Sequence, residues 1–123
     1  MRPSQLLALC LSVAPSALAD PKSNGIRVEN RGAFSGWFYV KSGAHESRHS
    51  GLLDTGQDHV FSFDDLVRNG FSDGENCWVD VDVEAGATNH ESGDNFDLSK
   101  TGNTETYKLT GSSLYPSWSR QFG

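Results

Sequence analysis

The chain is poor in cysteine, methionine and basic side chains, and it has no long hydrophobic run. Its 123 residues include two Cys, one Met, and 10 Lys and Arg against 16 Asp and Glu, for a formal net charge of −6. Clustered cations are what non-specific nucleic-acid binding requires, so we expect no nucleic-acid partner. A membrane-spanning helix needs about 20 apolar residues, so we expect no transmembrane segment. The length allows one domain and argues against a two-domain enzyme.

The first 19 residues have the pattern of a secretory signal peptide. Arg2 gives a positively charged start, residues 6–13 form an apolar stretch, and Ala17-Leu18-Ala19 supplies the small residues that a signal peptidase accepts. We therefore expect a secreted protein. Its mature chain would be residues 20–123, a single domain that has lost Arg2 and carries a net charge of −7.

Cysteine is too scarce for a disulfide framework in that mature chain. Cys10 lies in the predicted signal peptide, so Cys77 would be left alone although a secretory compartment permits disulfides. Cys77 then either packs as a small buried side chain or joins two chains through an intermolecular bridge, which would make a homodimer. In both cases the core and the sheet hydrogen bonds must hold the domain together.

What the sequence has in quantity is short alternating segments separated by Gly, Asn, Asp and Ser. Such spacing predicts an all-β fold, a single β-sandwich of about seven short antiparallel strands with at most one short helix. The helical candidate is residues 64–70, with Asp64 as its N-cap. Pro116 should restrict its strand to a sheet edge, and residues 20–25 should form a loose N-terminal arm. The expected strands are residues 26–30, 36–41, 59–63, 77–85, 95–98, 105–109 and 114–119.

The clearest strand pattern covers residues 77–85. Its odd positions, from Cys77 to Ala85, are small and apolar, whereas its even positions are acidic except for Trp78. This pattern predicts one buried face and one acidic face in solvent. The acids of this segment and the next could bind Ca²⁺ or simply keep an outer face soluble, and we favour the second interpretation because EF-hand spacing is missing. These acids are Asp80, Asp82, Glu84, Glu91, Asp94 and Asp97.

Aromatic side chains exceed what a core of this size ordinarily needs. An exposed ring beside carboxylates suits a glycan, a lipid head group or a protein surface, while the alternative is packing under a loop or at a sheet edge. Trp78 falls on the same strand face as the acids. The candidate ligand-binding residues are Trp37, Tyr39, Trp78, Tyr115 and Trp118.

Motifs of catalysis are missing from the sequence. It has no Gly-x-Ser-x-Gly elbow and no phosphate-binding glycine loop. His45 and His49 have a spacing that can share a metal on a helix, but they fall in a polar, serine-rich loop. We therefore expect a non-enzymatic protein with no catalytic residues, no metal ligands and no cofactor.

Three segments in order carry a resemblance to known proteins. They are Ile26-x-Val28-x-Asn30-Arg31-Gly32, then residues 37–43 (Trp-Phe-Tyr-Val-Lys-Ser-Gly), then residues 53–57 (Leu-Asp-Thr-Gly-Gln). This order resembles the opening of small acidic β-sandwich proteins, the aegerolysin-like group of fungi and bacteria and a nematode family up-regulated in long-lived insulin-receptor mutants. The resemblance covers residues 26–63 and the region of Trp118. It implies a compact sandwich that binds lipid head groups or another protein and performs no chemistry. Aegerolysins generally lack a signal peptide, whereas this chain has one.

The sequence therefore predicts a small secreted binding protein, such as an effector, a toxin component or a lectin. Its aromatic-acidic surface would recognise a lipid head group, a glycan or a protein. One alternative is a Ca²⁺-dependent adhesion or structural module that uses Asp80, Asp82, Asp94 and Asp97. A second alternative is a small hydrolase with two catalytic carboxylates, although a chain this short offers little wall for a cleft.

Overall fold

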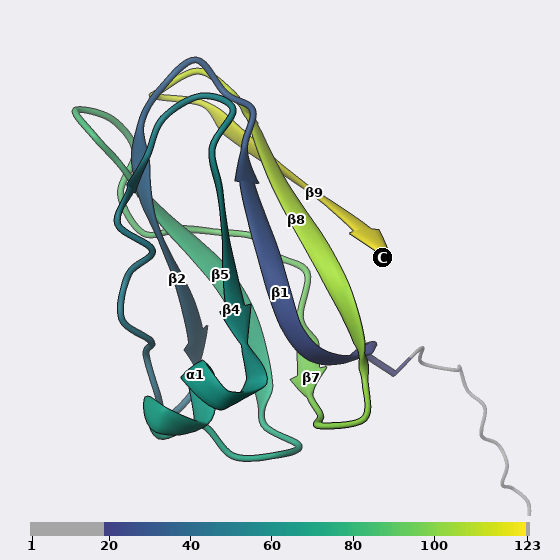
Figure 1. Cartoon of the computed structure of the whole chain (residues 1–123). Helices are drawn as coiled ribbons and strands as arrows, with labels where there is room; N and C mark the ends of the chain where they lie inside the picture. The colour runs from purple at the N-terminus through teal and green to yellow at the C-terminus, as the bar shows by residue number, and fades with distance from the viewer. Residues whose placement is uncertain (1–18, 123) are drawn as a thin grey trace, which may run out of the picture.

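The computed structural model describes residues 19–122, and within that range the regular structure consists of β-strands and one short helix (Figure 1). Residues 1–18, which contain nearly all of the predicted signal peptide, lie outside the described residues. The predicted all-β fold is confirmed. The elements are β1 (Lys22–Asn30), β2 (Gly36–Ser42), β3 (Leu52–Leu53), β4 (Asp58–Ser62), α1 (Phe63–Arg68), β5 (Asn76–Val83), β6 (His90–Glu91), β7 (Phe96–Leu98), β8 (Asn103–Gly111) and β9 (Pro116–Phe122).

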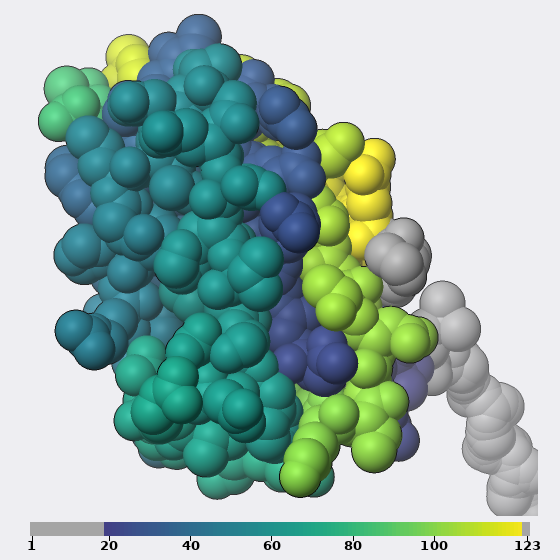
Figure 2. Space-filling view, in the orientation of Figure 1, coloured from purple at the N-terminus to yellow at the C-terminus, as the bar shows by residue number. Residues whose placement is uncertain are grey.

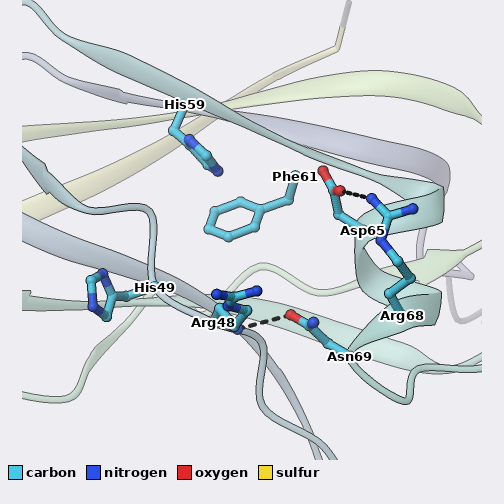
Figure 3. A pocket seen from close by; sticks show the side chains of 7 residues that line it. All are labelled: Arg48, His49, His59, Phe61, Asp65, Arg68 and Asn69. Carbon is cyan, nitrogen blue, oxygen red and sulfur yellow. Dashed lines mark hydrogen bonds and ion pairs between the residues drawn. The ribbon is translucent and has the colours of Figure 1, made fainter.

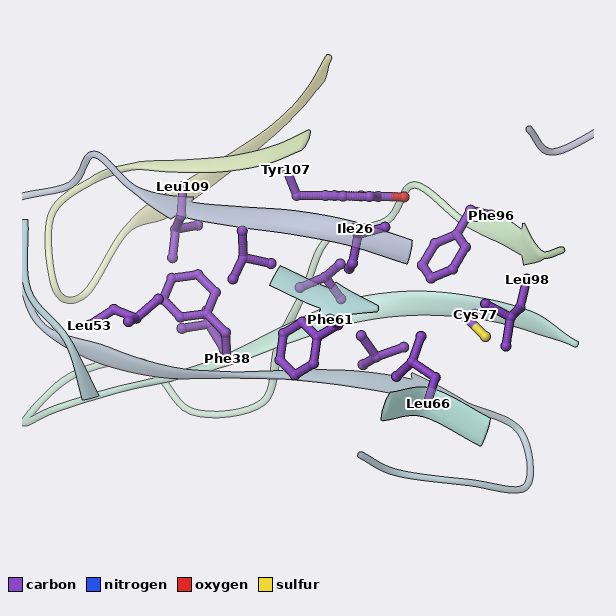
Figure 4. Packing of buried hydrophobic residues seen from close by; sticks show 14 of the residues in the cluster. Ile26, Phe38, Leu53, Phe61, Leu66, Cys77, Phe96, Leu98, Tyr107 and Leu109 are labelled. Carbon is purple, nitrogen blue, oxygen red and sulfur yellow. The ribbon is translucent and has the colours of Figure 1, made fainter. Parts of the chain in front are cut away.

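The strands form two facing layers that are linked by hydrogen bonds at one corner. The continuous path is β3-β2-β5-β7-β1-β8-β9, with β4 paired to β1 and β6 paired to β5. Short β7 pairs with both β5 and β1, so it joins the layer of β2 and β5 to the layer of β1, β4, β8 and β9. Side chains fill the space between the layers (Figure 4). For example, the rings of Phe38 on β2 and Trp118 on β9 meet edge to face, with 5.8 Å between their centroids.

β1 is the central strand of its layer, and not all of its pairings are antiparallel. It pairs antiparallel with β4 but parallel with β8 and, at its start, with β7. The expectation of antiparallel strands therefore holds for most of the sheet but not for these two pairs. Alternation of apolar and polar residues shows which face of a strand is buried, but it does not carry the direction of the neighbouring strand.

Most of the expected loose arm at residues 20–25 is instead strand, because β1 begins at Lys22. Lys22 and Ser23 pair with β7, and Gly25 lies opposite Ser62 of β4. The buried Ser23 hydroxyl donates to the Asn103 carbonyl at 3.0 Å. The polar groups of this segment make hydrogen bonds with neighbouring strands. From composition alone, such a segment cannot be distinguished from a flexible terminus.

The core follows the alternation expected for β5. The odd positions of β5 are fully or almost fully buried, as are Ile26 and Val28 of β1 and Leu109 of β8. Ala85 was expected to continue this row, but it is exposed and has a φ of 55°, because the strand ends at Val83 and the chain turns there. The buried members from β5 are Cys77, Val79, Val81 and Val83.

The helix begins one residue before the predicted segment. Ser62 is the N-cap in place of Asp64, since its hydroxyl accepts the Asp65 N–H at 3.1 Å and the Asp65 carboxylate accepts the Ser62 N–H. Gly70 follows the C-cap Asn69 with a φ of +100°, and Pro116 begins an edge strand, as predicted. Within residues 19–122, no helix has the length and apolar character needed to cross a membrane.

Candidate functional site

Three of the five candidate aromatic residues lie on one outer face of the sheet. The antiparallel register places Trp37 opposite Asp82, Tyr39 opposite Asp80, and Lys41 opposite Trp78. Facing residues of an antiparallel pair project to the same side, and the alternate residues of β2 are buried in the core. We call the outward side the β2–β5 face. It consists of Trp37, Tyr39, Lys41, Trp78, Asp80 and Asp82, together with Leu52 of β3.

The aromatic rings of this face are partly accessible. Trp37, Tyr39 and Trp78 are half-buried, and Leu52, which pairs with Trp37, is 41% exposed. The Tyr39 ring contacts the His49 ring edge to face, with centroids 6.0 Å apart. Burial and the nearby Asp82 carboxylate raise the pKa of Tyr39, so its hydroxyl remains a hydrogen-bond donor at neutral pH.

Asp80 differs from its predicted role as a solvent-facing acid. Its side chain is 1% exposed and lies 2.6 Å from Lys41 Nζ. Burial raises the pKa of Asp80 although Lys41 opposes the shift, and the bond to Asp80 raises the pKa of Lys41. Lys41 Nζ also approaches Glu46 at 3.6 Å and Asn89 Oδ1 at 3.3 Å. The expected acidic stripe is therefore interrupted by a buried ion pair.

Two other acids of the proposed Ca²⁺ site, Asp82 and Asp97, accept hydrogen bonds from different residues. Asp82 Oδ1 accepts the Asn89 N–H at 2.7 Å, and Asp97 Oδ1 accepts from Asn76 Nδ2 at 2.8 Å. In the described part of the chain, no three His, Cys, Asp or Glu side chains come together as metal ligands. The Ca²⁺ alternative thus has no ligand cluster among residues 19–122.

The other two candidate aromatic residues lie away from the β2–β5 face. Trp118 packs against the rings of Phe38 and Tyr107, and its Nε1 donates to the His90 carbonyl at 3.1 Å. These contacts give Trp118 a structural role between the layers. Tyr115 is 80% exposed, but it belongs to the turn that joins β8 to β9.

Cys77 is buried, which is one of the two alternatives that the sequence left open. Its side chain has no exposed surface, and it is a free thiol. Burial raises the pKa of Cys77 to about 12, so the thiol is protonated at neutral pH. A buried, protonated thiol is neither a nucleophile nor a partner for an intermolecular disulfide while the chain stays folded.

Sequence reasoning missed a pocket that lies outside the β2–β5 face. This pocket has a volume of about 570 Å³ and is lined by Arg48, His49, His59, Phe61, Asp65, Arg68 and Asn69 (Figure 3). The available signal was the gathering of His45, His49, His59 and two arginines within residues 45–68 of an acidic chain. Residues 44–51 have no periodic pattern, so the sequence predicts only a solvated loop there.

The hydrolase alternative requires two carboxylates that face each other across a cavity. The pocket at residues 48–69 contains one carboxylate, Asp65. Two smaller pockets also contain one each, Glu105 and Asp64 respectively. None of these three pockets has the pair of acids that glycoside hydrolysis uses.

Comparison with known proteins gives little further information. No family model matches the chain, and no curated protein matches its sequence. A solved structure called "Trapped Toxin" is similar with a TM-score of 0.45 and 13% sequence identity, over 80% of this chain and 23% of that one. The chain therefore spans less than a quarter of that structure's length, and a likeness this distant carries no functional argument. The resemblance to aegerolysin-like proteins stays a prediction.

Proposed function

We propose that this protein is a secreted, non-enzymatic glycan-binding protein and that the β2–β5 face is its binding surface. The observation that supports this proposal is the strand register, which sets Trp37, Tyr39 and Trp78 on one side of the sheet, with Asp82 opposite Trp37. The predicted signal peptide supports the secreted part of the proposal.

The chemistry of the β2–β5 face suits a sugar. A pyranose ring has an apolar C–H face and a rim of hydroxyl groups that both donate and accept hydrogen bonds. Partly exposed Trp37 and Tyr39 offer flat apolar surfaces, and Leu52 extends them. Beside Trp37, the Asp82 carboxylate offers an acceptor for the hydroxyl groups of a sugar.

A cationic lipid head group suits this face less well. Such a group would bind over an aromatic ring and beside a carboxylate. Lys41 already occupies this place, because its Nζ is 5.9 Å from the Tyr39 ring centroid and 2.6 Å from Asp80. A quaternary or primary ammonium would have to displace Lys41 from Asp80 and leave the Lys41 charge to be resolvated, whereas a neutral polyhydroxyl ligand would not.

A glycan array tests the proposal. The full chain should bind a restricted set of glycans, and Trp37→Ala and Trp78→Ala should each weaken that binding about tenfold or more, the usual effect of removing a central aromatic contact. Tyr115→Ala is the matched control, because it removes an aromatic ring that lies in the β8–β9 turn. Melting temperatures of all variants would show whether they are folded.

Two results would contradict the proposal. One is that the folded chain binds no glycan, or binds it equally well after both tryptophan substitutions. The other is that it binds vesicles containing choline or ethanolamine lipids through this face and binds no glycan, which would make a lipid head group the ligand.

A further inference from the structure

The pocket at residues 48–69 lies at an open edge of the sandwich. The segment before β3 runs beside β2, since the Ser47 N–H donates to the Val40 carbonyl and the Ser50 N–H to the Phe38 carbonyl. In the facing layer, β4 pairs only with β1 and is therefore an edge strand. Residues of these two edges and of α1 form the front of the molecule in the space-filling view (Figure 2). The pocket is thus a gap between two sheet edges, and its Phe61, only 4% exposed, belongs to the core.

The charge of this pocket is opposite to that of the whole chain. It contains two arginines and two histidines but one carboxylate, in a chain whose net charge is −6. That carboxylate, Asp65, is already bonded to Arg68 and to the Ser62 N–H. Of the acids nearby in sequence, Asp58 pairs with Arg27 and Glu46 pairs with Lys41.

Arg48 is held in place by its backbone rather than by its charge. Its main-chain N–H donates to Asn69 Oδ1 at 2.8 Å, which ties the loop to the C-terminal end of α1. Its guanidinium makes no hydrogen bond or ion pair with any residue in 19–122. Arg48 is an exposed residue, so the five N–H donors of its guanidinium are open to solvent or to a ligand.

His59 offers a second group without a partner. Its ring packs edge to face on Phe61, with centroids 4.7 Å apart, and neither ring nitrogen bonds to another described residue. In the close-up, His59 and Arg48 flank the Phe61 ring (Figure 3). The pocket therefore combines an apolar floor with donors on two sides.

We propose that this pocket binds a tetrahedral oxyanion, a phosphate or sulfate group, with Arg48 as its cationic ligand and His59 as a further hydrogen-bond donor. Arg68 stays paired with Asp65 and adds only the N–H donors that this pair leaves free. The planar fork of a guanidinium matches two oxygens of such a group. The volume of about 570 Å³ exceeds that of a bare ion and lies in the range of small-molecule sites, so the group would be carried by a small organic molecule. This site is separate from the β2–β5 face, and the proposal does not depend on glycan binding there.

Titration with inorganic phosphate and inorganic sulfate tests the site, with chloride at matched ionic strength as the reference. In ¹H–¹⁵N spectra of the full chain, saturable shifts should appear at residues 48, 59 and 69. Arg48→Gln should weaken the affinity about tenfold, since a charge-assisted contact is lost. The matched control is Arg31→Gln, because Arg31 pairs with Glu29 outside the pocket, and it should leave the affinity unchanged.

A second titration separates a free ion from a carried group. Glucose 6-phosphate and glucose 6-sulfate should bind more tightly than the inorganic ions, whereas glucose should not shift these residues. The proposal is overturned if no shift saturates, if Arg48→Gln and Arg31→Gln weaken binding equally, or if unmodified glucose shifts the pocket residues as strongly. Shifts confined to the β2–β5 face would also overturn it, while leaving the glycan proposal intact.

Discussion

At the scale of single residues, two buried carboxylates have basic partners at different distances. Asp80 lies 2.6 Å from Lys41, whereas Glu105 Oε1 lies 3.8 Å from Arg120 Nε. Burial is the largest cause that raises the pKa of each acid. Removing one partner of such a pair leaves a desolvated charge behind, which destabilises a protein more than the intact pair stabilises it.

Lys41→Met should therefore destabilise the fold by about 3 kcal/mol at pH 7.5. The substitution leaves Asp80 buried and charged, so its pKa rises further above the unfolded value. The folded chain then holds the Asp80 proton more tightly than the unfolded chain does, and the loss of stability should shrink as the pH falls toward 5. Urea denaturation at both pH values measures this difference. The exposed Lys100→Met is the control, and an equal loss at both pH values would contradict the argument.

His59 should make the folded protein less stable as the pH falls, which is opposite to the trend expected for Asp80 in Lys41→Met. Burial lowers its pKa in the folded chain below the ordinary 6.5. Between these two pKa values the unfolded chain binds more protons, so stability should fall as the pH drops through 6.5 and below. His59→Gln should flatten this slope, whereas Val60→Gln, at an exposed position of the same strand, should keep it. The measurement is the free energy of unfolding from pH 7.5 to 5. An unchanged slope in His59→Gln would show that His59 does not cause the pH dependence.

At the scale of elements, β1 depends on a glycine where its register shifts. Gly25 follows the irregularity after Ser23, has a φ of +151°, and lies between β4 and β8. A Cβ at this position would lie 2.6 Å from the Phe61 carbonyl oxygen of β4. The neighbouring strands fix both backbones, so neither can move away without breaking ladder hydrogen bonds.

Gly25→Ala should accordingly destabilise the protein by about 2 to 3 kcal/mol, through backbone strain and the close contact with β4. Gly43→Ala is the matched control, because no atom lies within 4 Å of a Cβ added there. Thermal unfolding of the two variants measures the difference. Similar melting temperatures for both would show that β1 and β4 are not held as closely as described.

Sequence patterns predicted the elements that depend on local chemistry. The alternation in β5 identified its buried valines, and the proline at residue 116 identified an edge strand. What the patterns missed depends on residues distant in sequence. Asp80 is buried because Lys41 pairs with it across the sheet, and Lys22 joins β1 because β7 lies beside it. The sequence named Trp37 and Trp78 as candidates, but only the register shows that they share one side of the sheet.

At the scale of the whole molecule, the single cysteine of the described chain is part of the core. Cys77 lies on β5 among the valines that face β1 and β8, and it has no exposed surface. No disulfide bond therefore contributes to the stability of residues 19–122. The packed layers and the sheet hydrogen bonds hold the fold together.

The Cys77 thiol should react with a thiol reagent such as Ellman's reagent at least about a hundredfold more slowly in the folded chain than in urea, because it is buried and its pKa is raised to about 12. A Cys10→Ser background removes the other thiol of the sequence. Non-reducing electrophoresis of the same sample should show no disulfide-linked dimer. Rapid labelling under native conditions, or a dimer lost on reduction, would contradict the burial of Cys77.

The parallel pairing of β1 with β8 affects how the chain is made. Ser23 and Asn103 are bonded across 80 residues, so β1 leaves the ribosome long before its neighbour β8 exists. At typical synthesis rates of 5–20 residues per second, β1 lacks its neighbour β8 for on the order of 4 to 16 seconds, so Ile26 and Val28 have only one of their two flanking strands during that time. The nascent chain therefore cannot complete its core before synthesis is nearly finished.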